Sequence, residues 1–600
     1  MIIRCLVTTA LFALAPLAFA ADQPADEGRH LPRVEPIAPI SDEDSARASA
    51  QGELSHLSGS SRTFGKKTPG TIPGDFAPWW IRGQRNTLGE GDRSEGVNLE
   101  NLFVRAINYS TQIKVFSDLP LIRETGITEA AGAFDTTAFL EGRFDRRNEP
   151  VGNTLTTGGS SRFKQDEWAV ETGIRKKINT GAEVRVSQEF SRIDNNSIYF
   201  TPNPQSRATL SLQVIQPLLR GAGMAYNRSI MQIARLDSEV AMHEFVRQSE
   251  SHLLEIARTY WALYAARVTY LQKAKLIDET ARITDELKAR QKVDAQKSQL
   301  FRAESALADR RAALIRSEAA VRNAQDRLKA LTSDPRLTGD AHVEIVPGDR
   351  LVLTNNGADA QSAARVAMEN RPEIQQAFLQ LRAASIREKM SKNELMPELN
   401  LVLNGTLGGL DNDYGGAYGR EWNTGGPGYG AGLVLSFPLE NHAAKARYER
   451  RRIEMRQQIN QLKTTIDTVM LEVKISAREV GTAWREMQAK YAAVEAYTAD
   501  VSTIEARRSM LTLDDSMQMG AYLDTVLDSQ DRRTLAEEDF IRAAANYQVA
   551  LVNMQRAKGR LLAYESVNVV RDVDERGVPL LYLEKGARGG KEAKAPVPAK

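Results

Sequence analysis

The chain has 600 residues, a formal net charge of +2 and a mean hydropathy of −0.39. It is too long for one ordinary domain, and beyond its first twenty residues it has no apolar run long enough for a membrane-spanning helix. The near balance of charge provides no basic surface for nucleic acid, so we expect no nucleic-acid partner. A soluble periplasmic protein and an outer-membrane β-barrel both remain open, because barrel strands alternate in polarity.

Residues 1–20 have the pattern of a signal peptide. Arg4 supplies a positive charge, residues 6–17 are apolar, and Ala18-Phe19-Ala20 fits a cleavage site. We therefore expect export across the inner membrane. The only cysteine, Cys5, lies inside this segment, so the exported chain would have no thiol for a disulfide bond, a metal or a nucleophile.

Two terminal regions are predicted to lie outside the folded body. Residues 21–93 are rich in Pro, Gly, Ser and mixed charge and are predicted to form a disordered N-terminal arm. The aromatic cluster of this arm, residues 76–80, could dock on the body as a packing anchor. Residues 566–600 are predicted to be a C-terminal tail, in which Lys, Ala, Pro and Gly repeat from Gly586 onward.

Two long regions have the pattern of helices. Residues 224–334 contain neither Gly nor Pro, residues 439–576 contain no Pro, and apolar residues recur in both at steps of three and four. A single helix as long as the second region would extend for about 150 Å. Each region is therefore expected to fold back as a hairpin, with reversals near residues 292–294 and 513–516 and arms of about 50 to 60 residues.

Segments of alternating polarity precede each helical region and predict β-strands. The candidate strands are residues 137–144, 168–174, 182–190, 210–214, 398–407 and 433–437. The second and third form a hairpin around Asn179-Thr180-Gly181. Whether this hairpin joins the same sheet as the others stays open at this point.

The glycine-rich segment 404–430 precedes the last candidate strand. It includes Gly425-Gly426-Pro427-Gly428 but has no following Lys-Ser/Thr pair, so a phosphate-binding loop is not supported. A flexible external loop is the interpretation that we favour.

The order of elements repeats along the chain, which indicates an internal duplication. Residues 94–340 form the first predicted repeat, and residues 361–565 form the second, each with a helix, strands and a helical hairpin. Residues 341–360 are the predicted connector between them, in an equatorial region.

This pattern resembles the TolC-like outer-membrane efflux proteins, also called outer membrane factors. The resemblance is carried by the element order, by the Pro-Leu junctions at Pro217 and Pro438, and by residues 522–530. It implies a mixed α and β homotrimer, in which strands from three chains close one β-barrel in the lipid of the outer membrane. Long α-helical hairpins would form a coiled-coil tunnel through the periplasm.

The function that this resemblance implies is a passive duct, the outer-membrane channel of a tripartite efflux or type I secretion system. Its partners would be a periplasmic adaptor (membrane fusion) protein and an inner-membrane pump. Oligomerisation also has a physical reason, because the strands of one chain cannot close a barrel in lipid. Four strands per chain would give a trimer twelve, and the extra hairpin would raise this to eighteen. The alternative is a periplasmic coiled-coil scaffold or envelope structural protein without channel activity.

Two acidic residues are the candidate periplasmic gate. Asp524 and Asp528 are four residues apart on one predicted helix face, and the resemblance implies acidic rings in this helix. The alternative is a solvated face with ion pairs to nearby arginines, which are Arg507, Arg508, Arg532 and Arg533.

The hairpin tips are the candidate contacts for an adaptor, and their residues are Val293, Asp294, Asp514 and Asp515. We predict no catalytic residue, no cofactor and no metal site, and hence no enzyme. His243 and His252 are not at a metal-ligand spacing, and no cluster of histidine or cysteine accompanies them.

Overall fold

The computed structural model describes residues 93–290, 297–339, 343–357, 359–507, 516–574 and 578–586, together with several residues between 72 and 88. All of them belong to one compact unit, Pro69–Lys600. The predicted signal peptide and all four predicted tip residues lie outside the described residues.

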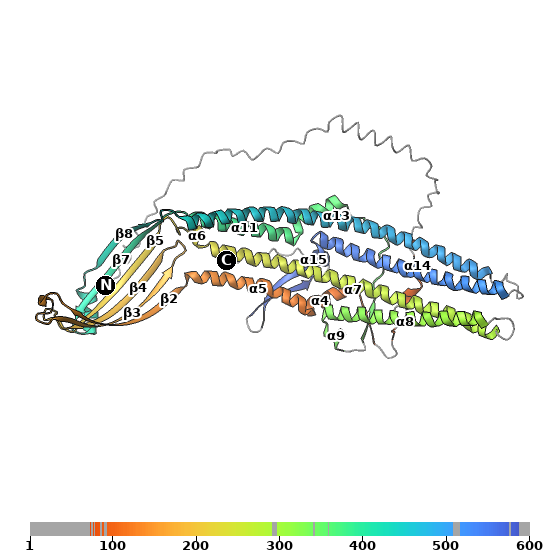
Figure 1. Ribbon diagram of the computed structural model, residues 1–600, viewed down its shortest axis with the longest axis horizontal. Coiled ribbons are helices and arrows are strands. Elements are labelled where there is room, and N and C mark those ends of the chain that lie inside the picture. Colours follow the sequence, from red (N-terminus) through yellow and green to blue (C-terminus); the bar gives the residue numbers. More distant parts are fainter. Residues whose placement is uncertain are drawn as a thin grey trace, which may run out of the picture. The chain divides into compact units, whose positions relative to one another are not determined.

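Two helical hairpins dominate the structure, as the breaker-free regions predict (Figure 1). The first consists of α7 (Ser229–Arg290) and α8 (Lys297–Thr332), with the short α6 (Met224–Asn227) before it. The second consists of α13 (His442–Arg507) and α14 (Ser516–Ala557). The two hairpins contact each other mainly through α7 and α14.

No helix within the described part of the chain has the length and apolar character needed to cross a membrane.

The arms of each hairpin are unequal, which differs from the predicted 50 to 60 residues. Helices α7 and α13 have 62 and 66 residues, whereas α8 and α14 have only 36 and 42. Helix α8 ends beside Ser333, which has φ +50°, and α14 ends near Gly559, which has φ +66°. Both left-handed residues interrupt the helical path, because an L-residue rarely continues a right-handed helix from that conformation.

Separate helices occupy the space beside the long arms beyond these ends. Helices α4 (Leu99–Tyr109) and α5 (Thr111–Ala131) precede the first strands, and both contact α7. Helices α10 (Ala360–Asn370) and α11 (Pro372–Asn393) precede the later strands, and both contact α13. These short helices lead the chain into the sheet.

The sheet has six antiparallel strands in the order β2-β3-β4-β5-β7-β8 (Figure 1). Their bounds are Thr136–Pro150, Arg162–Lys177, Glu183–Asn195, Gln205–Pro217, Glu398–Asp411 and Gly428–Ser436. The predicted extra hairpin, β3 and β4, lies within this sheet, and Gly181 in its turn has φ +95°. Strands β2 and β7 are longer than predicted, because residues beyond the alternating segments continue to pair with β3 and β5.

The glycine-rich segment differs from the predicted flexible loop. Its first residues complete β7, its last residues begin β8, and between them lies a helix, α12 (Tyr414–Asn423). The Asp413 carboxylate accepts the backbone N–H of Gly416 and so caps the helix. Helix α12 contacts strands β5 and β7.

The main hydrophobic core lies where the helices meet two small sheets. Fully buried residues such as Tyr260, Phe540 and Tyr547 are at its centre. Strand β1 (Arg93–Val97) pairs in parallel with β6 (Val343–Pro347), and α9 (Pro335–Thr338) precedes β6. The buried Arg267 guanidinium donates to Glu344 and so fixes β6 against α7.

Part of the predicted N-terminal arm is ordered against this core. Helix α3 (Trp80–Gly83) is short, and Ile72 and Trp80 are buried. The Phe76 ring lies edge-on to the ring of Tyr491, with centroids 5.0 Å apart. The docked aromatic cluster corrects the prediction of disorder for these residues, because large apolar side chains gain free energy on burial.

Part of the predicted C-terminal tail is also ordered. After α15 (Leu561–Tyr564), strands β9 (Val567–Val573) and β10 (Pro579–Lys585) pair as an antiparallel hairpin. Leu581 and Leu583 are buried, and the Lys585 ammonium pairs with Glu100 on α4. These contacts with distant helices explain why the segment does not remain a tail.

Candidate functional site

The six strands separate their side chains onto two faces of different chemistry. The strand registers run without a bulge, so alternate residues keep to one face across the whole sheet. We call one of them the apolar face, and its large side chains are Leu140, Phe144, Trp168, Val170, Ile174, Val184, Val186, Phe190, Leu210, Leu212, Val214, Leu399, Leu401, Leu403, Leu407, Tyr429, Leu433 and Leu435.

The apolar face is largely exposed. Leu140, Leu433 and Trp168 have 74%, 67% and 58% of their surface accessible. On the opposite face, Ala169 and Ser187 are buried. A sheet in water would place its apolar side chains against a core, so this arrangement is the reverse of the usual one.

The opposite face, which we call the charged face, carries ion pairs on β2, β3 and β4. The Arg143 guanidinium lies 2.8 Å from Asp145 and 3.5 Å from Glu167. Arg185 donates to Glu171 at 2.8 Å. On β7 this face carries small polar side chains such as Asn400, Asn404 and Thr406.

The candidate gate residues lie on the exposed surface of α14. The Asp528 carboxylate is 2.8 Å from the Arg532 guanidinium, one turn further along the same helix. The Asp524 carboxylate accepts a 2.6 Å hydrogen bond from Arg302 on α8. Both carboxylates are more than half exposed, and each has an arginine partner within the single chain.

Further arginines hold α14 to the first hairpin, and of these the sequence singled out Arg533 but not Arg302 or Arg310. Arg310 on α8 is buried, and its guanidinium lies 2.9 Å from Asp531 and 3.0 Å from the Leu527 carbonyl oxygen. Arg533 on α14 donates to Glu279 on α7 at 2.6 Å. Arg302 and Arg310 are eight residues apart on α8, which is about two helical turns. This spacing places both on one face of the helix and could have indicated from the sequence that they contact the same partner helix.

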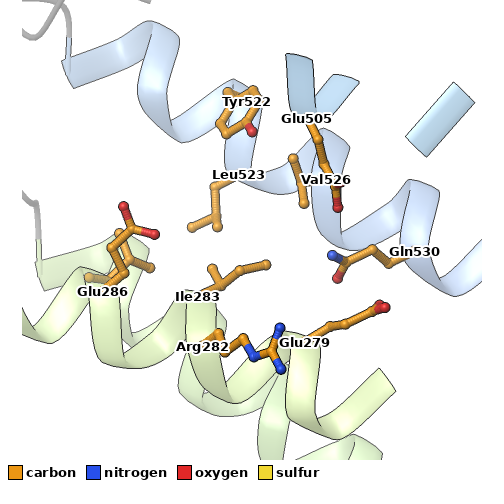
Figure 2. A pocket seen from close by; sticks show the side chains of 10 residues that line it. Glu279, Arg282, Ile283, Glu286, Glu505, Tyr522, Leu523, Val526 and Gln530 are labelled. Atoms are coloured by element: carbon orange, nitrogen blue, oxygen red, sulfur yellow. The ribbon is translucent and has the colours of Figure 1, made fainter. Parts of the chain in front are cut away.

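A cavity of about 300 Å³ lies beside these contacts, between α7, α13 and α14 (Figure 2). Apolar side chains form its centre, among them Ile283, Leu523 and Val526. Carboxylates lie at its border, from Glu279 and Glu286 on α7 and Glu505 on α13. Figure 2 shows the Leu523 and Ile283 side chains directed toward each other across it.

Glu250 and His252 are among the buried titratable residues of the helical body. Burial raises the pKa of the Glu250 carboxyl to about 7, although the backbone N–H of Leu561 donates to it. Burial also lowers the pKa of His252, whose Nε2 lies 3.1 Å from both the Ser110 hydroxyl and the Leu331 carbonyl oxygen. His252 therefore belongs to the packing between α4, α7 and α8.

No cluster of three or more potential metal ligands occurs among the described residues.

Comparisons with known proteins identify the fold. Residues 363–510 match the family model described as Outer membrane efflux protein. No curated protein sequence matches the chain.

Several solved structures share the fold. The outer-membrane channel OprN is 15% identical with a TM-score of 0.55, over 77% of this chain and 89% of that chain. A membrane protein from Pseudomonas aeruginosa is 16% identical with a TM-score of 0.57, over 77% and 93%. The Campylobacter jejuni CmeC outer membrane channel is 12% identical with a TM-score of 0.55, over 83% and 90%.

The matched family model names efflux proteins of the outer membrane, and two of these structures are described as outer-membrane channels. The chain thus combines an outer membrane efflux protein domain at residues 363–510 with the channel fold. The resemblance to TolC-like outer-membrane efflux proteins is confirmed, and the matched family model and channels are named as proteins of the outer membrane.

Proposed function

We propose that the protein is a passive duct through the outer membrane, and that it serves a tripartite efflux or type I secretion system. The observation that carries this proposal is the exposed apolar face on a sheet whose opposite face is charged. In an outer-membrane channel the apolar side chains contact lipid, and the polar side chains line the water-filled interior.

The duct would be a homotrimer, because the edges of the sheet need partners in lipid. Strands β2 and β8 each pair on one side only. The sheet has an even number of antiparallel strands, so these two edges run in opposite directions. Strand β8 of one copy can therefore pair antiparallel with β2 of the next copy. Three sheets of six strands would give eighteen, a number that leaves an aqueous channel.

The two halves of the chain would descend from a duplication. Helices α4 and α10 each have 11 residues, and each is followed by one extended residue. Ser110 has φ −60° and ψ 117°, and Arg371 has φ −66° and ψ 123°. The backbone N–H of each donates to an alanine carbonyl four residues earlier, at Ala106 and Ala367. This shared break supports the proposal.

Asp524 and Asp528 are proposed to form a gate at the periplasmic end of the duct. Threefold symmetry would bring six carboxylates toward one axis. Their arginine partners support a further step, because opening would require the 2.6 Å contact between Arg302 and Asp524 to change as α14 moves relative to α8.

The proposed partners are a periplasmic adaptor protein and an inner-membrane pump, with the adaptor at the hairpin tips. Photo-crosslinkers at Val293 and Asp514 would test this in cells. We expect covalent capture of a periplasmic protein at both tips, and none from a crosslinker at the buried Val321. Capture that is equal at all three positions would contradict the assignment.

The duct itself is tested by purification from outer membranes, followed by planar-bilayer recording. We expect a trimer that is sensitive to heating in detergent and that conducts ions. A coiled-coil scaffold without channel activity would give a water-soluble protein and no conductance.

A further inference from the structure

Helix α12 lies on the apolar face of the sheet. Gly409 on β7 shares this face with Leu403 and Leu407, because it is an even number of residues from both. A Cβ atom at Gly409 would lie 2.0 Å from the Ala417 carbonyl oxygen and 2.3 Å from the Glu421 nitrogen. The helix backbone therefore rests directly on this strand.

Contacts with β4 and β5 place the helix on the same face. The Gln188 amide donates to the buried Glu421 carboxylate at 3.1 Å, and the Phe190 ring contacts the rings of Tyr414 and Tyr418. Gln188 and Phe190 lie on the same face of β4 as Val184 and Val186, because every second residue of a strand points to the same side. On β5, Ser206 and Ala208 have no exposed surface. Three strands thus agree on the side that α12 covers.

The helix lies at the end of the sheet that is remote from the long helices. It connects the end of β7 to the start of β8, whereas Ser436 at the other end of β8 leads toward α13. Arg420 pairs with Asp411 at this outer end, at 3.1 Å. The helix is therefore at the outer border of the apolar face.

An aromatic stripe runs along α12. Tyr414, Tyr418 and Trp422 follow at steps of four residues and are 41%, 46% and 55% exposed. The nearby Tyr429 on the apolar face is 93% exposed and pairs with Gly405. The stripe therefore lies on the same side of the sheet as the exposed apolar face. Tyr and Trp have an apolar ring and a polar group, and they concentrate where hydrocarbon meets lipid headgroups.

We propose that α12 is an interfacial helix on the outside of the channel wall, with Tyr418 and Trp422 in the headgroup region of the outer leaflet. The proposal rests on the proposed function, in which the apolar face contacts lipid. The occupant of this surface is phospholipid or glycolipid rather than a second protein. The helix widens the membrane-contacting surface at the level where the apolar face of β7 has two glycines instead of side chains, Gly405 and Gly409.

Spin labels would test the proposal on the full-length protein in vesicles of phosphatidylethanolamine and phosphatidylglycerol. Cys5 is the only cysteine, so a Cys5→Ser background accepts a single label at Trp422→Cys. Leu433→Cys on the apolar face and Ser211→Cys on the charged face are the matched controls. Collisions with oxygen report lipid, and collisions with a water-soluble nickel complex report water.

We expect the Trp422 label to collide with oxygen more than the Ser211 label and less than the Leu433 label. Its depth should correspond to about 5–10 Å into the headgroup boundary. Gly409→Ala should displace the helix and move the Trp422 label toward water. Gly430→Ala should not, because no atom lies within 4 Å of a Cβ placed there.

Two results would overturn the interfacial helix but leave the proposed function intact. One is a Trp422 label that collides only with nickel while the Leu433 label collides with oxygen. The other is a Trp422 label that neither reagent reaches, which would mean that protein covers it. If the Leu433 label also collides mainly with nickel, the proposed function fails together with the interfacial helix.

Discussion

The sheet and the helical core treat apolar side chains in opposite ways. In the core, Tyr260, Phe540 and Tyr547 are completely buried. In the sheet, Leu140, Trp168 and Leu433 are exposed, and the less accessible face carries ion pairs. The comparison teaches how the proposed duct would meet two solvents. The core gains free energy by excluding water, whereas in the proposed duct lipid would cover the apolar face of the sheet.

The largest effect is expected from a cavity in the core. Phe540→Ala should reduce stability by about 3–5 kcal/mol, because Phe540 is fully buried and its ring contacts those of Phe76 and Tyr491. Leu535→Ala on the same helix is the control, since Leu535 is 60% exposed, and it should cost less than about 0.5 kcal/mol. Thermal unfolding in detergent measures both. Equal losses would mean that this core does not dominate stability.

A charge on the sheet tests the other side of the comparison. Leu433→Arg on the apolar face should destabilise membrane insertion by about 2–4 kcal/mol, because the guanidinium would enter hydrocarbon. Val434→Arg, the next residue on β8, points to the charged face and should have little effect. The amount of heat-sensitive trimer in outer-membrane fractions is the readout. A greater loss from Val434→Arg would reverse the assignment of the two faces.

A buried carboxyl makes the stability of the helical body depend on pH. Burial raises the pKa of Glu250 to about 7 from 4.5, so the folded chain holds this proton over that range while the unfolded chain releases it. Stability should therefore fall by up to about 3 kcal/mol as pH rises from 4.5 to 7, and should then level off.

Melting temperatures at several pH values measure this effect. In Glu250→Gln this part of the decline should disappear, because the amide does not titrate and its oxygen can still accept the Leu561 N–H. The same decline in both proteins would show that other groups cause it.

The smallest effect on stability is expected at the proposed gate. Asp528→Ala removes an exposed ion pair with Arg532 and should cost less than about 0.5 kcal/mol. Loss of a carboxylate ring should nevertheless raise single-channel conductance or alter block by cations. Asp500→Ala, an exposed aspartate on α13, is the control. Conductance and block that match the unsubstituted protein would remove Asp528 from the gate.

Local patterns in the sequence predict the main elements of this fold. The absence of Gly and Pro indicates α7 and α8, and alternating residues such as Leu433 and Leu435 indicate β8. Long-range contacts explain what was missed. The hairpin of β9 and β10 is held by Lys585 and Glu100, 485 residues apart, and α12 forms in a glycine-rich segment because Gly409 lets it rest on β7.

At the candidate gate, too, the sequence indicates the local contact but not the long-range one. Sequence proximity suggested Arg532 as a partner, and the structure pairs it with Asp528. The partner of Asp524, Arg302, is 222 residues away and belongs to the other hairpin. Spacing along one helix cannot identify such a contact. The role of both carboxylates as a gate stays a prediction.

The central claim is that three sheets join edge to edge around one channel, and disulfide formation between strands tests it most directly. Val434→Cys on β8 would be combined in turn with Phe139→Cys, Glu141→Cys or Arg143→Cys on β2, all on the charged face. We expect one combination to give a covalent trimer on denaturing gels. Val434→Cys with Ser211→Cys on the inner strand β5 should give none. Monomers from every β2 combination would contradict the claim.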